Sequence, residues 1–316
     1  MSADMILEAQ DLTKRYDAHG FGRRSRSAPA ALDGVSLAIR RGETIGLVGE
    51  SGSGKSTLAR VLLHLTPASS GRICFEGQDL ATLGRAEMRR LRRRMQIVFQ
   101  DPQASLNPRL RVRQTLGEAI RMAGGDTGSA SSLTALLDAV GLPARFADSR
   151  PHELSGGQRQ RVAIARALAV RPSFIVADEP VSALDVSVQA QILNLLADLR
   201  ESRGLTYLLI SHDLAVIRYL AERVAVMYRG RIVELAPAAR LFEAARHPYT
   251  QLLLASLPGT VRRAPIPAVE PRDSASAGCA FLARCPKAQA LCRQAQPPLA
   301  ALDSEHAVAC FVASGA

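Results

Sequence analysis

The chain carries Gly49-Glu50-Ser51-Gly52-Ser53-Gly54-Lys55-Ser56-Thr57 between a short β-favouring run, residues 44–48, and a helix-favouring run, residues 58–63. A strand, a glycine-rich turn and a helix start in this order predict a phosphate-binding P-loop. Glycines let the backbone curl so that successive N–H groups point at phosphate oxygens, and the helix N-terminus adds its dipole. We expect Lys55 to neutralise phosphate charge and the Ser56 hydroxyl to ligate Mg²⁺. The segment therefore predicts a nucleotide site.

Length and composition restrict the class of protein. The 316 residues allow one large core with a smaller appendage, and 47% apolar residues is typical of a globular protein. Because we find neither an apolar run of membrane-spanning length nor a signal-peptide segment, we expect a soluble or peripheral cytoplasmic protein. The net charge of +11 rests almost wholly on arginine. It allows a nucleic-acid or anionic-membrane partner, but the densest cluster, residues 89–94, lacks interleaved aromatic residues and favours a solvated helix face.

Hydrophobic patterning predicts the layout of the chain. Two runs, residues 6–16 and 31–39, predict strands of a small antiparallel sheet, with Asp17 to Ala30 between them as a mobile insertion. Two continuous apolar runs, residues 174–177 and 207–210, predict buried parallel strands. Polar residues follow both runs, as in a doubly wound sheet with its site at that edge.

An acidic pair complements the P-loop. Asp178 and Glu179 directly follow the apolar run 174–177. Phosphate hydrolysis needs a carboxylate on the Mg²⁺ side and a group that polarises the attacking water, and this pair suits both roles. The alternative, a helix N-cap or a surface turn, is less favoured in a chain that also carries a P-loop.

Taken together, these motifs resemble those of the ATP-binding-cassette (ABC) ATPases. The most family-specific piece is Leu154-Ser155-Gly156-Gly157-Gln158, which is similar to the signature that serves the ATP held by a partner subunit. The resemblance implies that Gln100 is the Q-loop residue, residues 182–185 the D-loop and His212 the switch histidine. It also implies that Tyr16 stacks on adenine. Without this resemblance, the simplest interpretation would be that Tyr16 packs in a strand and that His212 has a structural role.

The resemblance implies an α/β fold: a P-loop, RecA-like ABC ATPase core with an antiparallel β-subdomain, a helical subdomain at about residues 101–165 and a small cysteine-containing C-terminal appendage. A shift in composition to Pro, Ala and Arg beyond about residue 246 places the nucleotide-binding domain in residues 1–246 and a C-terminal domain in residues 247–316. The expected catalytic residues are Glu179, His212 and Gln100. Mg²⁺ is expected on Ser56 and Gln100, with Asp178 in its second shell. The residues expected to hold ATP are Tyr16, Gly49, Glu50, Ser51, Gly52, Ser53, Gly54, Lys55, Ser56, Thr57, Gln100, Asp178, His212, Ser155, Gly156, Gly157 and Gln158.

A finer resemblance is to the oligopeptide/dipeptide importer ATPases. It rests on residues 99–102 and 105–109, on His247-Pro248-Tyr249-Thr250-Gln251-Leu252-Leu253, on the insertion after Tyr16 and on the cysteine-bearing tail. It implies an ATP-hydrolysing subunit that powers peptide uptake from the cytoplasmic face of the inner membrane. The implied partners are a related but distinct ATPase subunit, two transmembrane permease subunits and an extracytoplasmic solute-binding protein. Nickel, glutathione or another solute is the alternative cargo. A DNA-associated ABC ATPase is the rival from another class, and no nucleic-acid partner is expected.

Four of the five cysteines lie near the C-terminus, with the spacing C-x5-C-x6-C-x17-C: Cys279, Cys285, Cys292 and Cys310. Disulfides are not expected in a reducing cytosol, and the spacing matches neither the common zinc pattern nor the short ferredoxin run. The residues themselves indicate four thiolates and one possible metal site. The resemblance implies a [4Fe–4S] cluster there, with zinc or unliganded thiols as alternatives.

Overall fold

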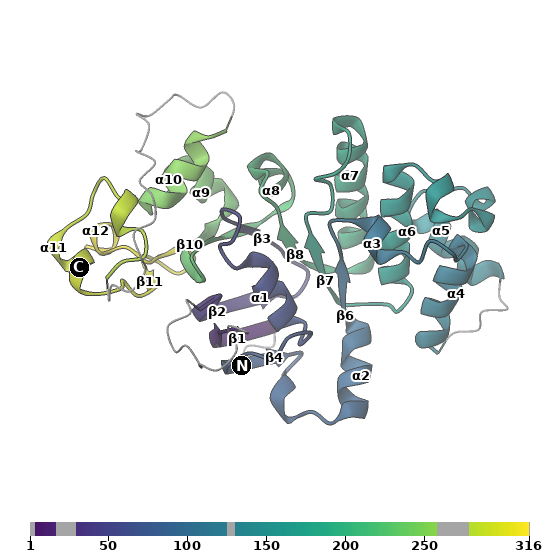
Figure 1. The fold of residues 1–316 in the computed structure, drawn as a ribbon, viewed down its shortest axis with the longest axis horizontal. Helices are drawn as coiled ribbons and strands as arrows, with labels where there is room; N and C mark the ends of the chain where they lie inside the picture. Colours follow the sequence, from purple (N-terminus) through teal and green to yellow (C-terminus); the bar gives the residue numbers. More distant parts are fainter. Residues whose placement is uncertain (1–3, 17–29, 125–129, 258–277, 316) are drawn as a thin grey trace, which may run out of the picture. The chain divides into compact units, whose positions relative to one another are not determined.

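The computed structural model describes residues 4–16, 30–124, 130–257 and 278–315, so the insertion expected at Asp17 to Ala30 lies almost wholly outside the described residues (Figure 1). The chain divides into two compact units. The first comprises residues 1–6, 40–44 and 76–211, and the second comprises residues 7–39, 45–75 and 212–316. The predicted boundary between domains near residue 246 stays a prediction.

The first unit is built on three parallel strands. These are β6 (Met95–Val98), β7 (Phe174–Asp178) and β8 (Thr206–Ile210). Strand β7 lies in the middle, with Phe174 opposite Met95 of β6 and opposite Thr206 of β8. Nearly every position of β7 and β8 is buried, which explains why both are continuous apolar runs in the sequence.

Helices follow and precede these strands. They are α2 (Arg85–Arg94), α3 (Pro102–Ser105), α4 (Val112–Met122), α5 (Ala130–Ala139), α6 (Gly156–Leu168) and α7 (Val186–Arg203), with a short strand β5 (Gln78–Asp79) and 3-10 turns at Leu80–Thr82, Ala144–Asp148 and Pro151–Glu153. Helices α4, α5 and α6 pack against one another in the region predicted to be helical (Figure 1). The apolar stripe of α4, with Leu116 and Ile120 buried, provides the i, i+4 spacing for this contact.

The second unit holds two sheets. Strands β2 (Leu32–Arg40), β1 (Met5–Lys14) and β4 (Ser70–Phe75) lie side by side in that order, and β1 and β4 pair antiparallel. The two strands predicted for the small sheet, β1 and β2, are thus neighbours in it. In the other sheet β3 (Thr44–Val48) pairs parallel with β9 (Arg223–Tyr228). Beyond β9 the pairing is antiparallel through β10 (Arg231–Pro237), β12 (Ala307–Val308) and β11 (Ala300–Ala301).

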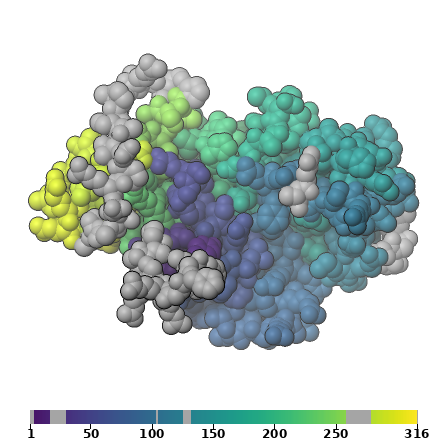
Figure 2. All heavy atoms as spheres, viewed as in Figure 1, coloured from purple at the N-terminus to yellow at the C-terminus, as the bar shows by residue number. Residues whose placement is uncertain are grey.

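The C-terminal residues thus extend a sheet of the second unit, which the sequence did not predict. Strands β11 and β12 have two residues each, too few for a recognisable alternation. In Figure 2 the C-terminal segment, in yellow, lies beside the green residues that include β10. The helices of this unit are α1 (Lys55–Leu62), α8 (Leu214–Leu220), α9 (Ala238–Ala244), α10 (Pro248–Ala255), α11 (Ala290–Gln294) and α12 (Phe311–Ser314), with a 3-10 turn η4 at Leu282–Arg284.

The basic helix α2 is largely solvated, as expected. It buries Met88 and Leu91, whereas four of its last five arginines are exposed and Arg93 is half-buried. Arg94 pairs with Glu76 at 2.8 Å, and Arg93 donates to the Met122 carbonyl oxygen at 3.1 Å. A search of the described residues finds no helix with the length and apolarity needed to span a bilayer.

Candidate functional site

The predicted P-loop connects β3 to α1, and two of its glycines are required by close backbone approaches. A Cβ on Gly49, at φ +154°, would lie 2.1 Å from the Met227 carbonyl oxygen. A Cβ on Gly54, at φ +107°, would lie 2.5 Å from the Ala31 carbonyl oxygen. Both positions therefore exclude any other residue, on steric and on conformational grounds.

The same loop presents donors suited to an anion. Gly54 is the N-cap of α1, so no side chain caps the helix, and its first turn holds no acidic residue. The Lys55 ammonium folds back over the loop and donates to the carbonyl oxygens of Gly49 at 2.6 Å and Glu50 at 2.9 Å. The Ser53 Oγ is buried and has no hydrogen-bond partner among the described residues. An orphaned buried hydroxyl beside an uncapped helix start fits a phosphate cradle.

Two further predicted residues belong to the same unit as the P-loop. Tyr16 is about half exposed at 49%, and the Lys14 ammonium lies 5.1 Å from its ring centroid. Its ring is thus available for stacking rather than packed in a core. His212 is exposed and precedes α8, whose N-terminus is capped by Asp213 through a 2.8 Å bond from the Ala215 N–H.

The predicted carboxylates lie in the first unit at the carboxyl end of β7. Asp178 is the last residue of the strand, and Glu179 follows in a left-handed conformation at φ +50°. A hydrogen bond of 2.9 Å from the Glu179 N–H to the Ile210 carbonyl oxygen holds this conformation. Such backbone is uncommon outside glycine and clusters at functional sites. Gln100 is exposed just beyond β6, and because β6 runs parallel to β7 it lies at the same edge of the sheet.

The predicted signature opens helix α6. Ser155 is the N-cap: its Oγ accepts from the Gln158 N–H at 3.3 Å, and its own N–H donates to Gln158 Oε1 at 2.9 Å. This reciprocal capping box explains the Ser-x-x-Gln spacing. A Cβ on Gly157 would lie 2.4 Å from Val188 Cγ1 of α7, and one on Gly156 would lie 3.1 Å from Leu184. Close packing against the D-loop and α7 is therefore a structural reason for both glycines, and sequence reasoning missed it.

Each unit thus gathers part of the predicted site. The second unit contains Tyr16, the P-loop and His212, and the first contains Gln100, the signature, Asp178 and Glu179.

The four C-terminal cysteines are free thiols. Cys292 and Cys310 are buried, and Cys279 and Cys285 are half-buried. Burial raises the pKa of the Cys279 and Cys285 thiols, and the charges of neighbouring cysteines, Cys310 among them, raise it further. Across the described residues, no group of three or more His, Cys, Asp and Glu side chains is arranged to hold a metal ion. The predicted [4Fe–4S] cluster therefore has no support from this geometry.

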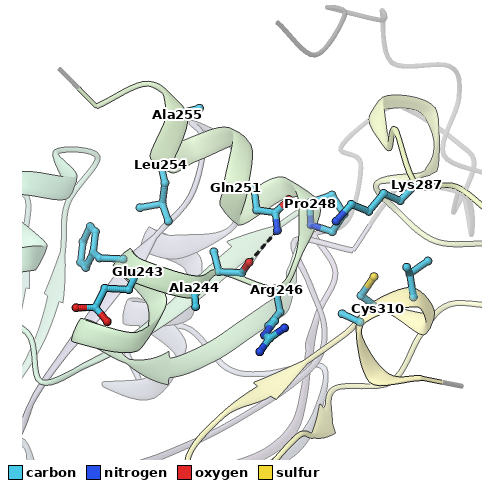
Figure 3. Close-up of a pocket in the computed structure, with 13 residues that line it drawn as sticks. Glu243, Ala244, Arg246, Pro248, Gln251, Leu254, Ala255, Lys287 and Cys310 are labelled. Atoms are coloured by element: carbon cyan, nitrogen blue, oxygen red, sulfur yellow. Dashed lines mark hydrogen bonds between the residues drawn. The ribbon is translucent and has the colours of Figure 1, made fainter. Parts of the chain in front are cut away.

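A cavity of about 670 Å³ lies elsewhere in the second unit (Figure 3). It is lined by α9 and α10, by Lys287 and by the chain around α12. Within it Gln251 Nε2 donates to the Ala245 carbonyl oxygen at 2.8 Å. Cys310 is the one predicted site residue in its wall, so this cavity is not the nucleotide site.

Comparison with known sequences identifies the family. The ABC transporter family model matches residues 32–182, and the model of the oligopeptide/dipeptide transporter C-terminal region matches residues 233–292. A Brucella abortus protein named as a peptide import ATP-binding protein is 48% identical, over 98% of this chain and 94% of its own length. The chain belongs to the ABC transporter ATPase family. This ABC ATPase is also 47% identical, over 98% of its length and 90% of the relative's, to a Sinorhizobium fredii protein named as a peptide ABC transporter ATP-binding protein.

Solved ABC structures support the same assignment. An ATP-binding cassette in a dimeric, post-hydrolysis state bound to ADP and Pi is 32% identical and superimposes with a TM-score of 0.64, covering 73% of this chain and 98% of that one. The protein cbiO1 of Clostridium perfringens, part of the transporter complex cbiONQ, is 30% identical with a TM-score of 0.67, covering 76% and 92%. The predicted α/β ABC ATPase fold is therefore confirmed, as is the resemblance to the peptide-importer branch.

Proposed function

We propose that this ABC ATPase hydrolyses ATP to power the uptake of oligopeptides or dipeptides through separate membrane subunits. The observation that carries this proposal is the joint match of one chain to the ABC transporter and oligopeptide/dipeptide C-terminal models. Relatives aligned over almost the whole chain are named for peptide import, which favours peptides over nickel, glutathione or another solute. The same relatives give no support to a DNA-associated role.

The P-loop would hold the ATP phosphates. The uncapped start of α1 and the orphaned Ser53 Oγ support this role. Lys55 would exchange its bonds to the loop carbonyls for phosphate oxygens, and Ser56 and Gln100 would hold Mg²⁺, with Asp178 in its second shell. The metal supplies charge neutralisation at the phosphates. The remaining residues proposed to contact ATP are Tyr16, Gly49, Glu50, Ser51, Gly52, Gly54 and Thr57.

Glu179 would act as the general base. Its position after the last residue of β7 and its constrained left-handed backbone support a fixed carboxylate. The carboxylate accepts a proton from water as the water oxygen bonds to the γ-phosphorus, and the bridging P–O bond breaks to leave ADP and inorganic phosphate. His212 would contact the γ-phosphate, and Gln100 would help to orient the site.

The complete site would need a second ATPase subunit. Ser155, Gly156, Gly157 and Gln158 would contact the ATP held by the P-loop of the partner, in a head-to-tail dimer. The N-terminus of α6 supports this role, because the start of a helix presents backbone N–H groups and the positive end of its dipole to an anion. We propose a related but distinct chain as the partner, two permease subunits and an extracytoplasmic solute-binding protein. The ABC ATPase would then lie peripherally on the cytoplasmic face of the inner membrane.

The [4Fe–4S] cluster on Cys279, Cys285, Cys292 and Cys310 remains a separate proposal. It rests on the four cysteines and the family resemblance alone, since burial raises the pKa of the Cys279 and Cys285 thiols and the arrangement does not form a metal site among the described residues. Anaerobic purification tests it. A bound cluster gives brown protein with iron and sulfide, and colourless protein, with or without zinc, contradicts the proposal.

Reconstitution tests the proposed function. The ABC ATPase is assembled with its permease subunits and the binding protein in vesicles, and ATP-dependent uptake of labelled di- and oligopeptides is measured. We expect uptake that unlabelled peptide competes away and that nickel or glutathione does not. ATP-driven nickel or glutathione uptake without peptide uptake would replace the proposed cargo.

A further inference from the structure

We propose that Arg284 and Tyr249, which lie far from the P-loop in sequence, are positioning residues for it and act through Glu50. This inference rests on the proposed role of the P-loop in holding nucleotide. It adds a C-terminal contact that sets the shape and the charge of the loop.

The contact consists of three hydrogen bonds to one P-loop residue. The Glu50 backbone N–H donates to the Tyr249 hydroxyl oxygen at 2.8 Å. The Arg284 guanidinium donates to both carboxylate oxygens of Glu50, from Nη1 to Oε2 at 3.0 Å and from Nη2 to Oε1 at 2.9 Å. A bidentate arginine–carboxylate pair fixes orientation as well as distance.

Glu50 passes this constraint to the phosphate-binding lysine. Its carbonyl oxygen accepts from the Lys55 ammonium at 2.9 Å and from the Ser53 N–H at 3.1 Å. The N–H, the side chain and the carbonyl of Glu50 are therefore all engaged. A shift of the Arg284 or Tyr249 contact changes the path of the loop at Lys55.

The positioning residues are themselves held rigidly. Tyr249 is fully buried, with its ring centroid 4.5 Å from that of Tyr228 and 5.6 Å from that of Phe281. The Arg284 guanidinium lies 5.6 Å from the Phe281 centroid, and its bonds to Glu50 raise its pKa. Burial raises the pKa of Tyr249 as well, so its hydroxyl stays neutral. This aromatic cluster keeps both polar groups in place with little conformational freedom.

The charge of Glu50 allows a role of Arg284 in positioning the P-loop to be distinguished from a role in protein stability alone. A carboxylate on the loop that receives ATP repels the phosphates, and the interaction is only partly screened over a Debye length of about 8 Å. Arg284 neutralises that carboxylate. Loss of Arg284 alone leaves the repulsion in place, whereas loss of both charges removes it.

Nucleotide affinity of the full chain tests the inference. The dissociation constant for Mg-ATP is measured by calorimetry for Arg284→Gln, for Glu50→Gln and for the double variant. We expect binding about fivefold weaker for Arg284→Gln than for wild type, but a double variant that differs from Glu50→Gln alone by less than about twofold. Tyr249→Phe, which removes the acceptor of the Glu50 N–H, weakens binding by a similar factor while leaving the ion pair intact.

Arg240→Gln is the matched control. It breaks the Arg240–Asp303 pair in the same unit, which does not involve the P-loop, and should leave affinity unchanged. Melting temperatures without nucleotide report any general loss of folding, and Arg284→Met, which also removes the charge, serves if Arg284→Gln does not fold. Unchanged affinity in Arg284→Gln, or an equal loss from Arg284→Gln in the wild-type and Glu50→Gln backgrounds, overturns the inference. Failure of Lys55→Ala to weaken binding instead contradicts the proposed nucleotide site itself.

Discussion

At the scale of single residues, the buried His247 has a consequence for acid stability. The residue is 2% exposed, and burial lowers the pKa of its ring from 6.5 to about 4. The ring must be neutral in the fold, since Nδ1 accepts from the Tyr249 N–H at 3.0 Å to cap α10. In the unfolded chain the ring takes up a proton below about pH 6.5. The stability tied to its neutral form is therefore complete above that pH and is lost as the pH falls toward 4.

We expect this residue to account for about 2 kcal/mol of lost stability between about pH 7.5 and pH 5. Asn in its place keeps an N-cap acceptor but does not titrate. The free energy of unfolding in urea, measured at both pH values, should fall about 2 kcal/mol less for His247→Asn than for wild type. Equal losses in the two proteins would show that His247 does not titrate as inferred.

Glu179 makes a second prediction at this scale. Glu179→Gln keeps the size and the hydrogen-bonding capacity of the side chain but removes the base. We expect ATP binding to persist while turnover falls by about 100-fold or more, and ATP-loaded subunits to stay dimeric. Phosphate release and size-exclusion chromatography measure the two effects. Near-normal turnover would exclude Glu179 as the base.

At the scale of elements, the contact between α6 and α7 depends on a missing side chain. A Cβ on Gly157 would lie 2.4 Å from Val188 Cγ1, and valine has one strongly preferred rotamer in a helix and cannot easily move away. Gly157→Ala should therefore cost about 1–3 kcal/mol of unfolding free energy.

The effect of Gly157→Ala on the unfolding free energy should change from destabilising to stabilising when Val188 is replaced by alanine. In a Val188→Ala background, the new Cβ at position 157 no longer meets a Val188 methyl group. Gly157→Ala then stabilises α6 through helix propensity by up to about 1 kcal/mol. Urea denaturation of the four proteins in the cycle measures both effects. An equal cost in both backgrounds would mean that Val188 is not the group that excludes a side chain at Gly157.

The sequence predicts the elements of this protein unevenly. Strands β7 and β8 are recognisable as continuous apolar runs because both of their faces are buried. Helix α6 begins at Gly156, where two glycines conceal in the sequence a helix whose first turn is fixed by the Ser155 capping box. Strands β11 and β12 could not be predicted, because the pairing of β12 with β10 and of β11 with β12, and not a local pattern, makes them strands.

At the scale of the whole molecule, ligand binding and folding are linked. Only the folded chain has a P-loop, so Mg-ATP at about 100 times its dissociation constant should raise the stability by about 2.7 kcal/mol. A thermal melt with and without Mg-ATP measures this, and Lys55→Ala should abolish the shift. A shift that survives in Lys55→Ala would place the nucleotide elsewhere.

Sequence motifs predict the residues of the candidate site, but they do not predict the residues that we propose position the P-loop. Lys55 and Asp178, which we propose serve the phosphates and their Mg²⁺, lie in motifs with fixed spacing and are therefore visible in the sequence. Tyr249 and Arg284 carry no such signal, because their partner Glu50 is reached only through the folded chain. The four C-terminal cysteines show the reverse case: their pattern is visible in the sequence, but the described residues do not form the metal cluster that the resemblance implied.

The ion pair between Glu50 and Arg284 spans 234 positions of the chain. It joins one of the earliest motifs of the cassette to a turn near the C-terminus. A recombination event that exchanged only the C-terminal segment would keep Glu50 but could lose its arginine, leaving an uncompensated carboxylate on the loop. If Arg284 positions the P-loop as proposed, a chimaera whose C-terminal parent lacks this arginine should bind Mg-ATP about fivefold more weakly than one that keeps both Glu50 and Arg284.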